Sequence, residues 1–137
     1  MIKGHATMDA TTDYATRYAP VSYVSVGRTR LKASQAGFGG YRISSGVSQH
    51  EKALRAALCS GINLIDTSAN YADGGSETLV GPGLENHMTR GDLKRQQVIV
   101  ISKVGYLQGE NFALSQQRKS EGRPFQELVE YDQGLEH

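Results

Sequence analysis

A carboxylate, a phenol and an ammonium group lie close to the points where two apolar segments of the sequence end. The segment INLID (62–66) stops at Asp66, and Tyr71 follows five residues later among small and turn-forming residues. A second apolar segment, QVIVISKVG (97–105), carries Lys103 near its end. An ammonium beside a phenol favours the phenolate, and a carboxylate keeps that ammonium charged and in place. If the fold brings them together, these residue types indicate a tuned general acid–base.

The spacing of apolar residues predicts three strands that alternate with two helices. The strands are expected over residues 36–41, 62–66 and 97–105, and the helices over 48–61 and 76–88. Such alternation indicates parallel strands joined by right-handed crossovers. The carboxyl ends of parallel strands share one edge of a sheet, so Asp66 and Lys103 are expected to meet there, within reach of Tyr71.

The remaining segments predict the structure on either side of this unit. Residues 23–36 alternate around a Gly-Arg-Thr turn and predict a hairpin. Residues 1–20 show no period and predict a flexible leader, which leaves 21–137 as the folded domain. A polar, aperiodic stretch follows residue 108 and predicts a long loop. Pro82 inside the second helix removes a backbone hydrogen bond, so that helix is expected to be short or broken.

The order of these motifs resembles the aldo-keto reductase family over about residues 24–110. The family pattern has Asp-Thr-Ala/Ser, a tyrosine five residues after the Asp, Gly-x-Ser-Glu and a glycine. The matching residues are Asp66, Thr67, Ser68, Tyr71, Gly74 or Gly75, Ser76, Glu77 and Gly81. A strand that ends in Ser102-Lys103 matches as well, and GFGGYR (37–42) resembles the glycine turn that follows the family's first strand.

The resemblance implies a fold and a reaction. The fold is α/β, the N-terminal part of a (β/α)₈ TIM barrel with the hairpin closing its base. Eight such units need about 250 residues, so the chain is expected to stop partway through the barrel. The implied reaction is reversible hydride transfer between NADP(H) and a small carbonyl compound. Tyr71 would donate the proton to the carbonyl oxygen, Lys103 would tune that phenol, and Asp66 would pair with Lys103 and contact the cofactor ribose.

The resemblance also implies cofactor contacts and reveals one departure. Gly39, Gly40 and Tyr41, in the turn after the first strand, are expected to contact the nicotinamide cofactor together with Asp66. The family's fourth catalytic residue is a histidine at the end of the fourth strand. None of the four histidines follows an apolar strand; they are His5, His50, His87 and His137.

Composition excludes several other classes of protein. A chain of 137 residues with a net charge of +1 lacks the basic surface that nucleic acid requires. It has no apolar stretch near the ~20 residues of a membrane span, and its acidic start lacks a secretory signal. The single Cys59 excludes an internal disulfide and a cysteine-rich zinc site. We therefore expect a cytoplasmic protein without nucleic-acid, membrane or metal partners, and the oligomeric state stays open.

Simpler explanations exist for each residue and for the whole chain. Asp66 is of a type that forms turns after strands, Tyr71 lies in a polar loop, and Ser76 with Glu77 suits a helix cap and its first turn. GFGGYR lacks the third glycine of a dinucleotide fingerprint. The alternative functions are a non-catalytic cofactor-binding or regulatory module and a structural remnant of such an enzyme. The substrate and the choice between NADPH and NADH stay open.

Overall fold

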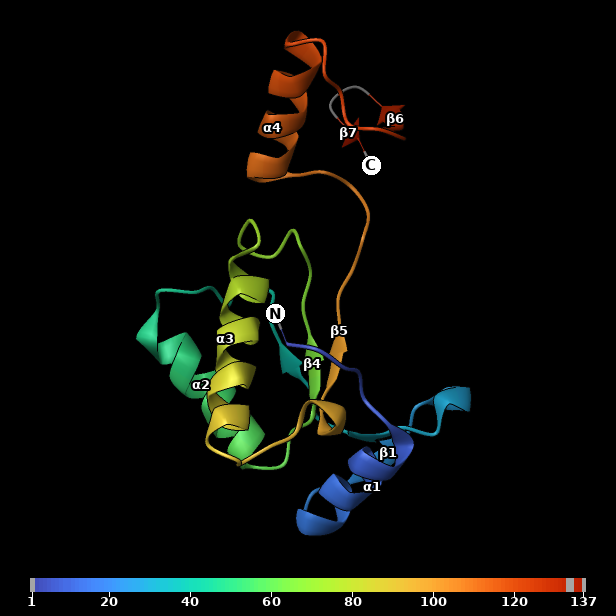
Figure 1. Cartoon of the computed structure of the whole chain (residues 1–137), viewed down its shortest axis with the longest axis vertical. Helices are drawn as coiled ribbons and strands as arrows, with labels where there is room; N and C mark the ends of the chain where they lie inside the picture. The colour runs from blue at the N-terminus through green and yellow to red at the C-terminus, as the bar shows by residue number, and fades with distance from the viewer. Residues whose placement is uncertain (1, 133–134, 137) are drawn as a thin grey trace.

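The parallel sheet expected in the chain is present in the computed structural model, which describes residues 2–132 and 135–136. Its strands, in spatial order, are β3 (Phe38–Gly39), β4 (Leu64–Asp66) and β5 (Ile99–Ile101). Gly39 and Ile101 both lie opposite Asp66, on either side of the central strand. The predicted order of parallel strands is confirmed, and the carboxyl ends of all three strands lie at one edge of the sheet (Figure 1).

Two helices connect these strands and lie on the same side of the sheet (Figure 1). They are α2 (Ser48–Cys59) and α3 (Gly75–Thr89). The expectation that α3 is short or broken is wrong, because the helix continues for 15 residues through Pro82. Pro82 is exposed and has a glycine on each side, which leaves room for its ring. Leu79, Val80 and Leu84 are buried on the opposite face, and their packing holds the helix together.

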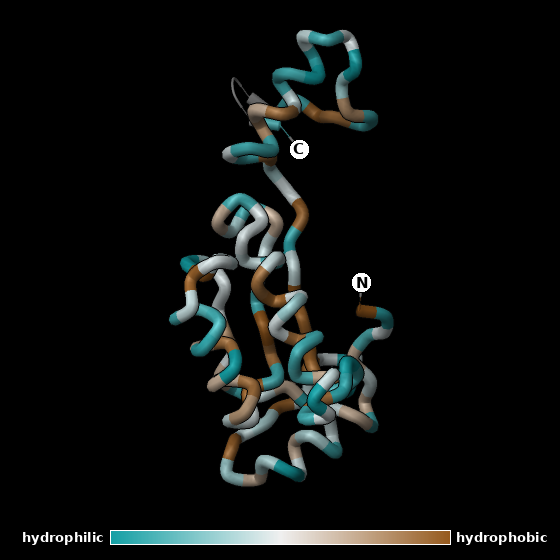
Figure 2. Tube along the Cα trace, turned by 60° about the vertical axis from the view of Figure 1, so that its left-hand side comes forward, coloured by the Kyte–Doolittle hydropathy of each residue, from teal (hydrophilic) through white to brown (hydrophobic). Residues whose placement is uncertain are grey.

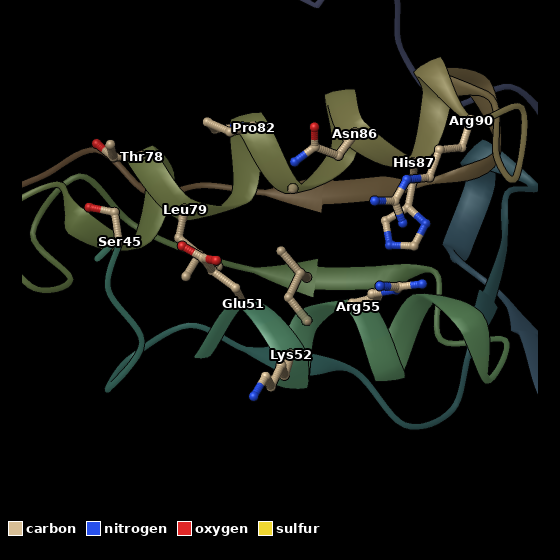
Figure 3. A pocket seen from close by; sticks show the side chains of 12 residues that line it. Ser45, Glu51, Lys52, Arg55, Thr78, Leu79, Pro82, Asn86, His87 and Arg90 are labelled. Carbon is tan, nitrogen blue, oxygen red and sulfur yellow. The ribbon is translucent and has the colours of Figure 1, made fainter. Parts of the chain in front are cut away.

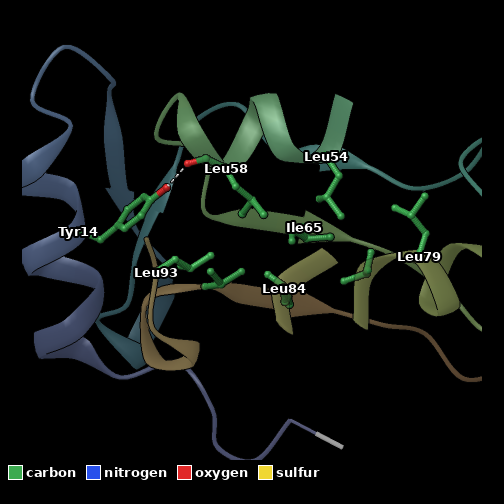
Figure 4. Close-up of a cluster of buried hydrophobic side chains, with 9 residues drawn as sticks. Tyr14, Leu54, Leu58, Ile65, Leu79, Leu84 and Leu93 are labelled. Carbon is green, nitrogen blue, oxygen red and sulfur yellow. Dashed lines mark hydrogen bonds between the residues drawn. The ribbon is translucent and has the colours of Figure 1, made fainter. Parts of the chain in front are cut away.

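An apolar core fills the space between the two helices and the sheet (Figure 4). Leu54 and Leu58 enter it from α2, and Ile65 of β4 is fully buried beneath them. Burying one such side chain stabilises the fold by about 1.5–3 kcal/mol. Figure 2 shows the most apolar residues along the strands inside this body. A Cβ at Gly83 would lie 2.7 Å from Leu54 Cδ2, so this glycine permits the close approach of the helices.

The N-terminal segment is a packed helix, so the flexible leader expected over residues 1–20 is wrong. Helix α1 spans Met8–Arg17, and the Thr7 hydroxyl caps it by accepting from the Ala10 backbone N–H at 3.4 Å. Tyr14 is only 1% exposed, and its hydroxyl donates to the Leu58 carbonyl oxygen at 2.8 Å. A single buried aromatic residue thus anchors this segment to the core. One buried apolar residue produces no helical period in the sequence, so the helix could not be recognised from the spacing of apolar residues.

The predicted hairpin is confirmed and is joined to the sheet by one buried amide. Strands β1 (Tyr23–Ser25) and β2 (Lys32–Ser34) pair antiparallel around a short 3₁₀ turn, η1 (Gly27–Thr29). Asn63, fully buried before β4, accepts from the Ser34 N–H at 2.8 Å. Its side-chain nitrogen donates to the carbonyl oxygens of Lys32 at 2.9 Å and Gln97 at 3.1 Å. Gln97 ends the turn η2 (Arg95–Gln97), so one side chain connects the hairpin, β4 and the approach to β5.

The C-terminal segment forms a helix and a small strand pair, so the long loop expected past residue 108 is wrong. Helix α4 (Gly109–Ser120) precedes β6 (Glu130–Asp132) and β7 (Leu135–Glu136), and the three elements lie beyond the carboxyl edge of the sheet (Figure 1). Glu136 holds the strands on the helix by accepting from Ser115 Oγ and Lys119 Nζ, both at 2.5 Å. Lys119 lowers the pKa of the Glu136 carboxyl, since its ammonium favours the charged form.

Candidate active site

The structure brings Asp66, Tyr71 and Lys103 together at the carboxyl edge of the sheet. Lys103 Nζ donates a hydrogen bond to Asp66 Oδ1 at 2.6 Å and a second one to the Thr67 carbonyl oxygen at 3.0 Å. The same ammonium lies 4.7 Å from the centre of the Tyr71 ring. This convergence is the geometry expected from the strand ends. The catalytic roles of the three residues stay predictions.

The contacts of Lys103 favour its charged form. The hydrogen bond to Asp66, followed by the interaction with Tyr71, raises the pKa of Lys103 above its ordinary value. Solvent screens the pair, because the side chains of Lys103 and Asp66 are 44% and 43% exposed. Lys103 therefore provides a fixed positive charge beside the Tyr71 ring throughout the neutral range.

Replacing Asp66 by asparagine is expected to bring the pKa of Lys103 down toward its ordinary ~10.4. The Asp66–Lys103 pair stabilises the folded state below that value. This stabilisation is lost only as pH rises through the raised pKa of Lys103. An NMR titration of the Lys103 side-chain carbons measures the change directly. Asp73→Asn removes a carboxylate from the loop that follows Asp66 and serves as the matched control. An unchanged Lys103 titration in Asp66→Asn would contradict the assigned pairing.

The loop after Tyr71 turns sharply through three consecutive residues in the left-handed region. Ala72, Asp73 and Gly74 have φ values of 51°, 49° and 86°. Only glycine adopts such angles without cost, and the others each cost about 1 kcal/mol or more. The Ser76 N–H donates to the Tyr71 carbonyl oxygen at 3.2 Å and closes the turn. Backbone strain of this kind clusters at functional sites. Here it lies directly after a candidate catalytic residue.

Buried hydrogen bonds fix the base of this loop. Thr67 and Ser76 are both buried, and their hydroxyl oxygens lie 2.8 Å apart. The Thr67 N–H donates to the Ile101 carbonyl oxygen at 2.8 Å, which holds the end of β4 against β5. Ser76 is therefore an interior contact of the site, and Gly74 occupies the N-cap of α3. The expectation that Ser76 caps this helix is wrong.

The three residues predicted to contact the cofactor differ in their surroundings. A Cβ at Gly39 would meet no atom within 4 Å, so this backbone is open to a ligand. A Cβ at Gly40 would lie 2.3 Å from Ser76 Oγ, so packing alone explains that glycine. Tyr41 is 69% exposed, and its ring lies edge-on to Tyr71 with the ring centres 5.3 Å apart. The cofactor roles of all three residues stay predictions.

Sequence reasoning missed several contacts that position the catalytic candidates. The Thr67 carbonyl oxygen accepts from Lys103, and backbone acceptors leave no signal in a sequence. Ser102 Oγ donates to Glu77 Oε1 at 2.5 Å and links the end of β5 to the first turn of α3. Asn70 Nδ2 donates to the Tyr106 carbonyl oxygen at 2.6 Å and links the catalytic loop to the segment before α4. Ser102 and Asn70 each lie next to a catalytic candidate in the sequence, so the polar neighbours of such residues are the signal that could have indicated these links.

His50 and His87 make their described contacts outside this site. His50 Nδ1 lies 3.1 Å from the Ser44 backbone nitrogen, and His87 Nδ1 lies 3.4 Å from Asp92 Oδ2. His137 lies outside the described residues. Across residues 2–132 and 135–136, no cluster of His, Cys, Asp and Glu is arranged to hold a metal ion. Within that same part of the chain, none of the helices has the length and apolarity needed to cross a bilayer.

Comparison with known proteins extends the family resemblance. The model of the Aldo/keto reductase family matches residues 36–124, which include the three strands and all three catalytic candidates. An aldo-keto reductase of Bacillus subtilis (strain 168), YhdN, is 36% identical over 89 residues, covering 61% of this chain and 25% of the relative. The NADH-specific methylglyoxal reductase of Escherichia coli (strain K12) is 34% identical over 91 residues, covering 60% and 26%. The chain thus spans about a quarter of the length of these curated relatives.

Solved structures show the same fold. The holo form of the aldo-keto reductase AKR11C1 from Bacillus halodurans matches with a TM-score of 0.56 and 27% identity, covering 66% of this chain and 28% of that one. A thermostable aldo-keto reductase, Tm1743, solved with the inhibitor epalrestat, matches with a TM-score of 0.53 and 24% identity, covering 73% and 38%. The expected fold class, part of a (β/α)₈ barrel, is confirmed by these matches.

Proposed function

The chain belongs to the aldo/keto reductase family, and we propose that it contributes the acid–base part of an NADP(H)-dependent reductase of small carbonyl compounds. The observation that carries this proposal is the position of Lys103 Nζ, 2.6 Å from Asp66 Oδ1 and 4.7 Å from the Tyr71 ring centre. An ammonium held between a carboxylate and a phenol is the arrangement that general acid catalysis by tyrosine requires.

The residues at the carboxyl edge fit a nicotinamide cofactor. Gly39 offers open backbone on one side of Asp66, and the exposed Tyr41 ring offers a flat aromatic surface beside Tyr71. Asp66 has a second carboxylate oxygen that the described contacts with Lys103 leave available for a ribose hydroxyl. When bound, the reduced nicotinamide would supply the hydride for the carbonyl carbon.

The residues of the chain would supply the proton and stabilise the charge that its transfer leaves behind. Tyr71 would donate its hydroxyl proton to the carbonyl oxygen as negative charge develops there. The positive charge of Lys103 would stabilise the phenolate left behind, and Asp66 would hold that ammonium in place. The strained turn from Ala72 to Gly74 and the Thr67–Ser76 pair would keep Tyr71 from drifting away. Errors of about 1 Å in such a geometry cost about a hundredfold in rate.

The preferred cofactor is proposed as NADP(H), by resemblance to the family. The Escherichia coli relative is named as NADH-specific, so both reduced cofactors belong in the test. The alternative proposal, a cofactor-binding or regulatory module without catalysis, rests on the exposure of the site. Asp66 and Lys103 are nearly half exposed, and Val104 beside them is fully exposed. Binding of cofactor without product would favour this alternative.

The proposal is tested by incubating the purified 137-residue chain with methylglyoxal and either NADPH or NADH, and measuring the alcohol product. We expect Tyr71-dependent reduction with a preference for NADPH. The rate should lie at least about a hundredfold below that of the Bacillus subtilis relative in the same assay, because solvent screens the charge of Lys103 in this half-exposed site. Product formation that Tyr71→Phe leaves unchanged would overturn the proposed site. A rate equal to that of the relative would overturn the argument from exposure.

A further inference from the structure

A cavity of about 470 Å³ lies between helices α2 and α3, and no residue of the proposed carbonyl site lines it. Its floor is apolar and includes Leu54 and Leu79, while Gly83 lets the two helices approach closely beneath it. A volume of this size lies within the range of ordinary small-molecule sites, about 300–1,000 Å³. It is therefore large enough for an organic ligand.

Cationic side chains from both helices line this cavity. Lys52 and Arg55 come from α2, and Arg90 caps the end of α3. Figure 3 shows the side chains of Arg55, His87 and Arg90 gathered at one end of the cavity. The one carboxylate in the lining, Glu51, lies toward the other end of the cavity beside Ser45 (Figure 3). The two arginines at the end near Arg90 outnumber the carboxylate there, Asp92, which lies beside His87.

None of these cations forms an ion pair in the described part of the chain. Among residues 2–132 and 135–136, no side-chain hydrogen bond or ion pair involves Lys52, Arg55 or Arg90. Two guanidinium groups at the same end of a cavity repel each other, and an anion bound at that end converts this repulsion into attraction. The planar fork of a guanidinium matches phosphate oxygens with two parallel hydrogen bonds. His87, held by Asp92 at 3.4 Å, adds a ring nitrogen at the same end.

We propose that the cavity between α2 and α3 binds a small organic phosphomonoester, with the phosphate between Arg55 and Arg90 and the organic part over Leu54 and Leu79. A bare phosphate would fill only a fraction of the cavity and leave the apolar floor uncovered. A neutral compound would leave the two arginines without an anion. The ligand must therefore combine a dianion with a compact apolar body. Asp66, Tyr71 and Lys103 do not line this site, so binding here can be measured separately from the proposed reduction.

Phenyl phosphate is the probe that tests this site, with inorganic phosphate and phenol as partial probes. Titration of the 137-residue chain, followed by NMR shifts of α2 and α3 residues, is expected to show saturable binding of phenyl phosphate. Inorganic phosphate should bind at least about tenfold more weakly, and phenol should not bind measurably. Equal affinity for phenyl phosphate and inorganic phosphate, or no saturation by about 10 mM phenyl phosphate, would overturn the proposal.

Single substitutions distinguish a specific binding site from nonspecific attraction of the anion to positive charge. Arg55→Gln and Arg90→Gln should each weaken phenyl phosphate binding about tenfold, since each removes charge-assisted hydrogen bonds. Arg28→Gln removes an exposed arginine from the distant hairpin turn η1 and should leave the affinity unchanged. All three positions are exposed, so the variants are expected to fold, and circular dichroism checks that they do. A loss of affinity in Arg28→Gln equal to that in Arg55→Gln would overturn the proposal.

Discussion

Replacing Tyr71 by phenylalanine is expected to reduce carbonyl reduction by about 10²–10⁴-fold, the range that general acid catalysis contributes. The substitution removes only the hydroxyl group. The ring that packs against Tyr41 and lies beside Lys103 is retained, so the site keeps its shape. Cofactor binding, measured by fluorescence of the reduced nicotinamide, should change little. The loss should therefore appear in kcat, with KM nearly unchanged.

Tyr106→Phe is a suitable control for this experiment. Tyr106 is also an exposed tyrosine near the carboxyl edge, and the substitution keeps the backbone carbonyl oxygen that accepts from Asn70 Nδ2. We expect its rate to stay close to that of the unchanged chain. Equal losses in Tyr71→Phe and Tyr106→Phe would show that the effect is not specific to the proposed acid. A Tyr71→Phe chain with full activity would remove the central residue from the mechanism.

The position of the candidate site could be predicted from the sequence because it depends on strand ends. Asp66 and Lys103 each lie at or just after the end of an apolar segment, and parallel strands place such ends at one edge. The Gly39–Asp66–Ile101 register then brings Lys103 to Asp66. The strain after Tyr71 could not be predicted in the same way. Ala72 adopts a positive φ that its residue type does not indicate.

The mistaken predictions concern segments that tertiary contacts hold in place. Helix α1 contributes one buried tyrosine, whose partner Leu58 is 44 residues away along the chain. In the C-terminal segment, Ser115 and Glu136 are 21 residues apart, and their contact has no local pattern. Pro82 predicted a break by a local rule, yet burial of its neighbours on the inner face of α3 outweighs the missing hydrogen bond. Long-range packing overrides local propensity in all three places.

Replacing Lys103 by methionine is expected to reduce the rate of carbonyl reduction by about 10²–10³-fold. The neutral side chain fills a similar space but removes the charge that lies 4.7 Å from the Tyr71 ring and the bond to Asp66. Electrostatic stabilisation of the charge that develops in the transition state is worth factors of about this size. Lys3→Met, at an exposed position near the N-terminus, is the matched control and should keep the full rate.

The combination of Lys103→Met with Tyr71→Phe tests whether the two residues act as one unit. Lys103 assists the reaction only through the phenolate of Tyr71, so once the hydroxyl is absent its charge has nothing left to stabilise. Residues that act together give effects that do not add. The double variant is therefore expected to be about as slow as the slower single variant. Losses that multiply would mean that Lys103 acts on the substrate or cofactor independently of Tyr71, and the proposed roles would have to be reassigned.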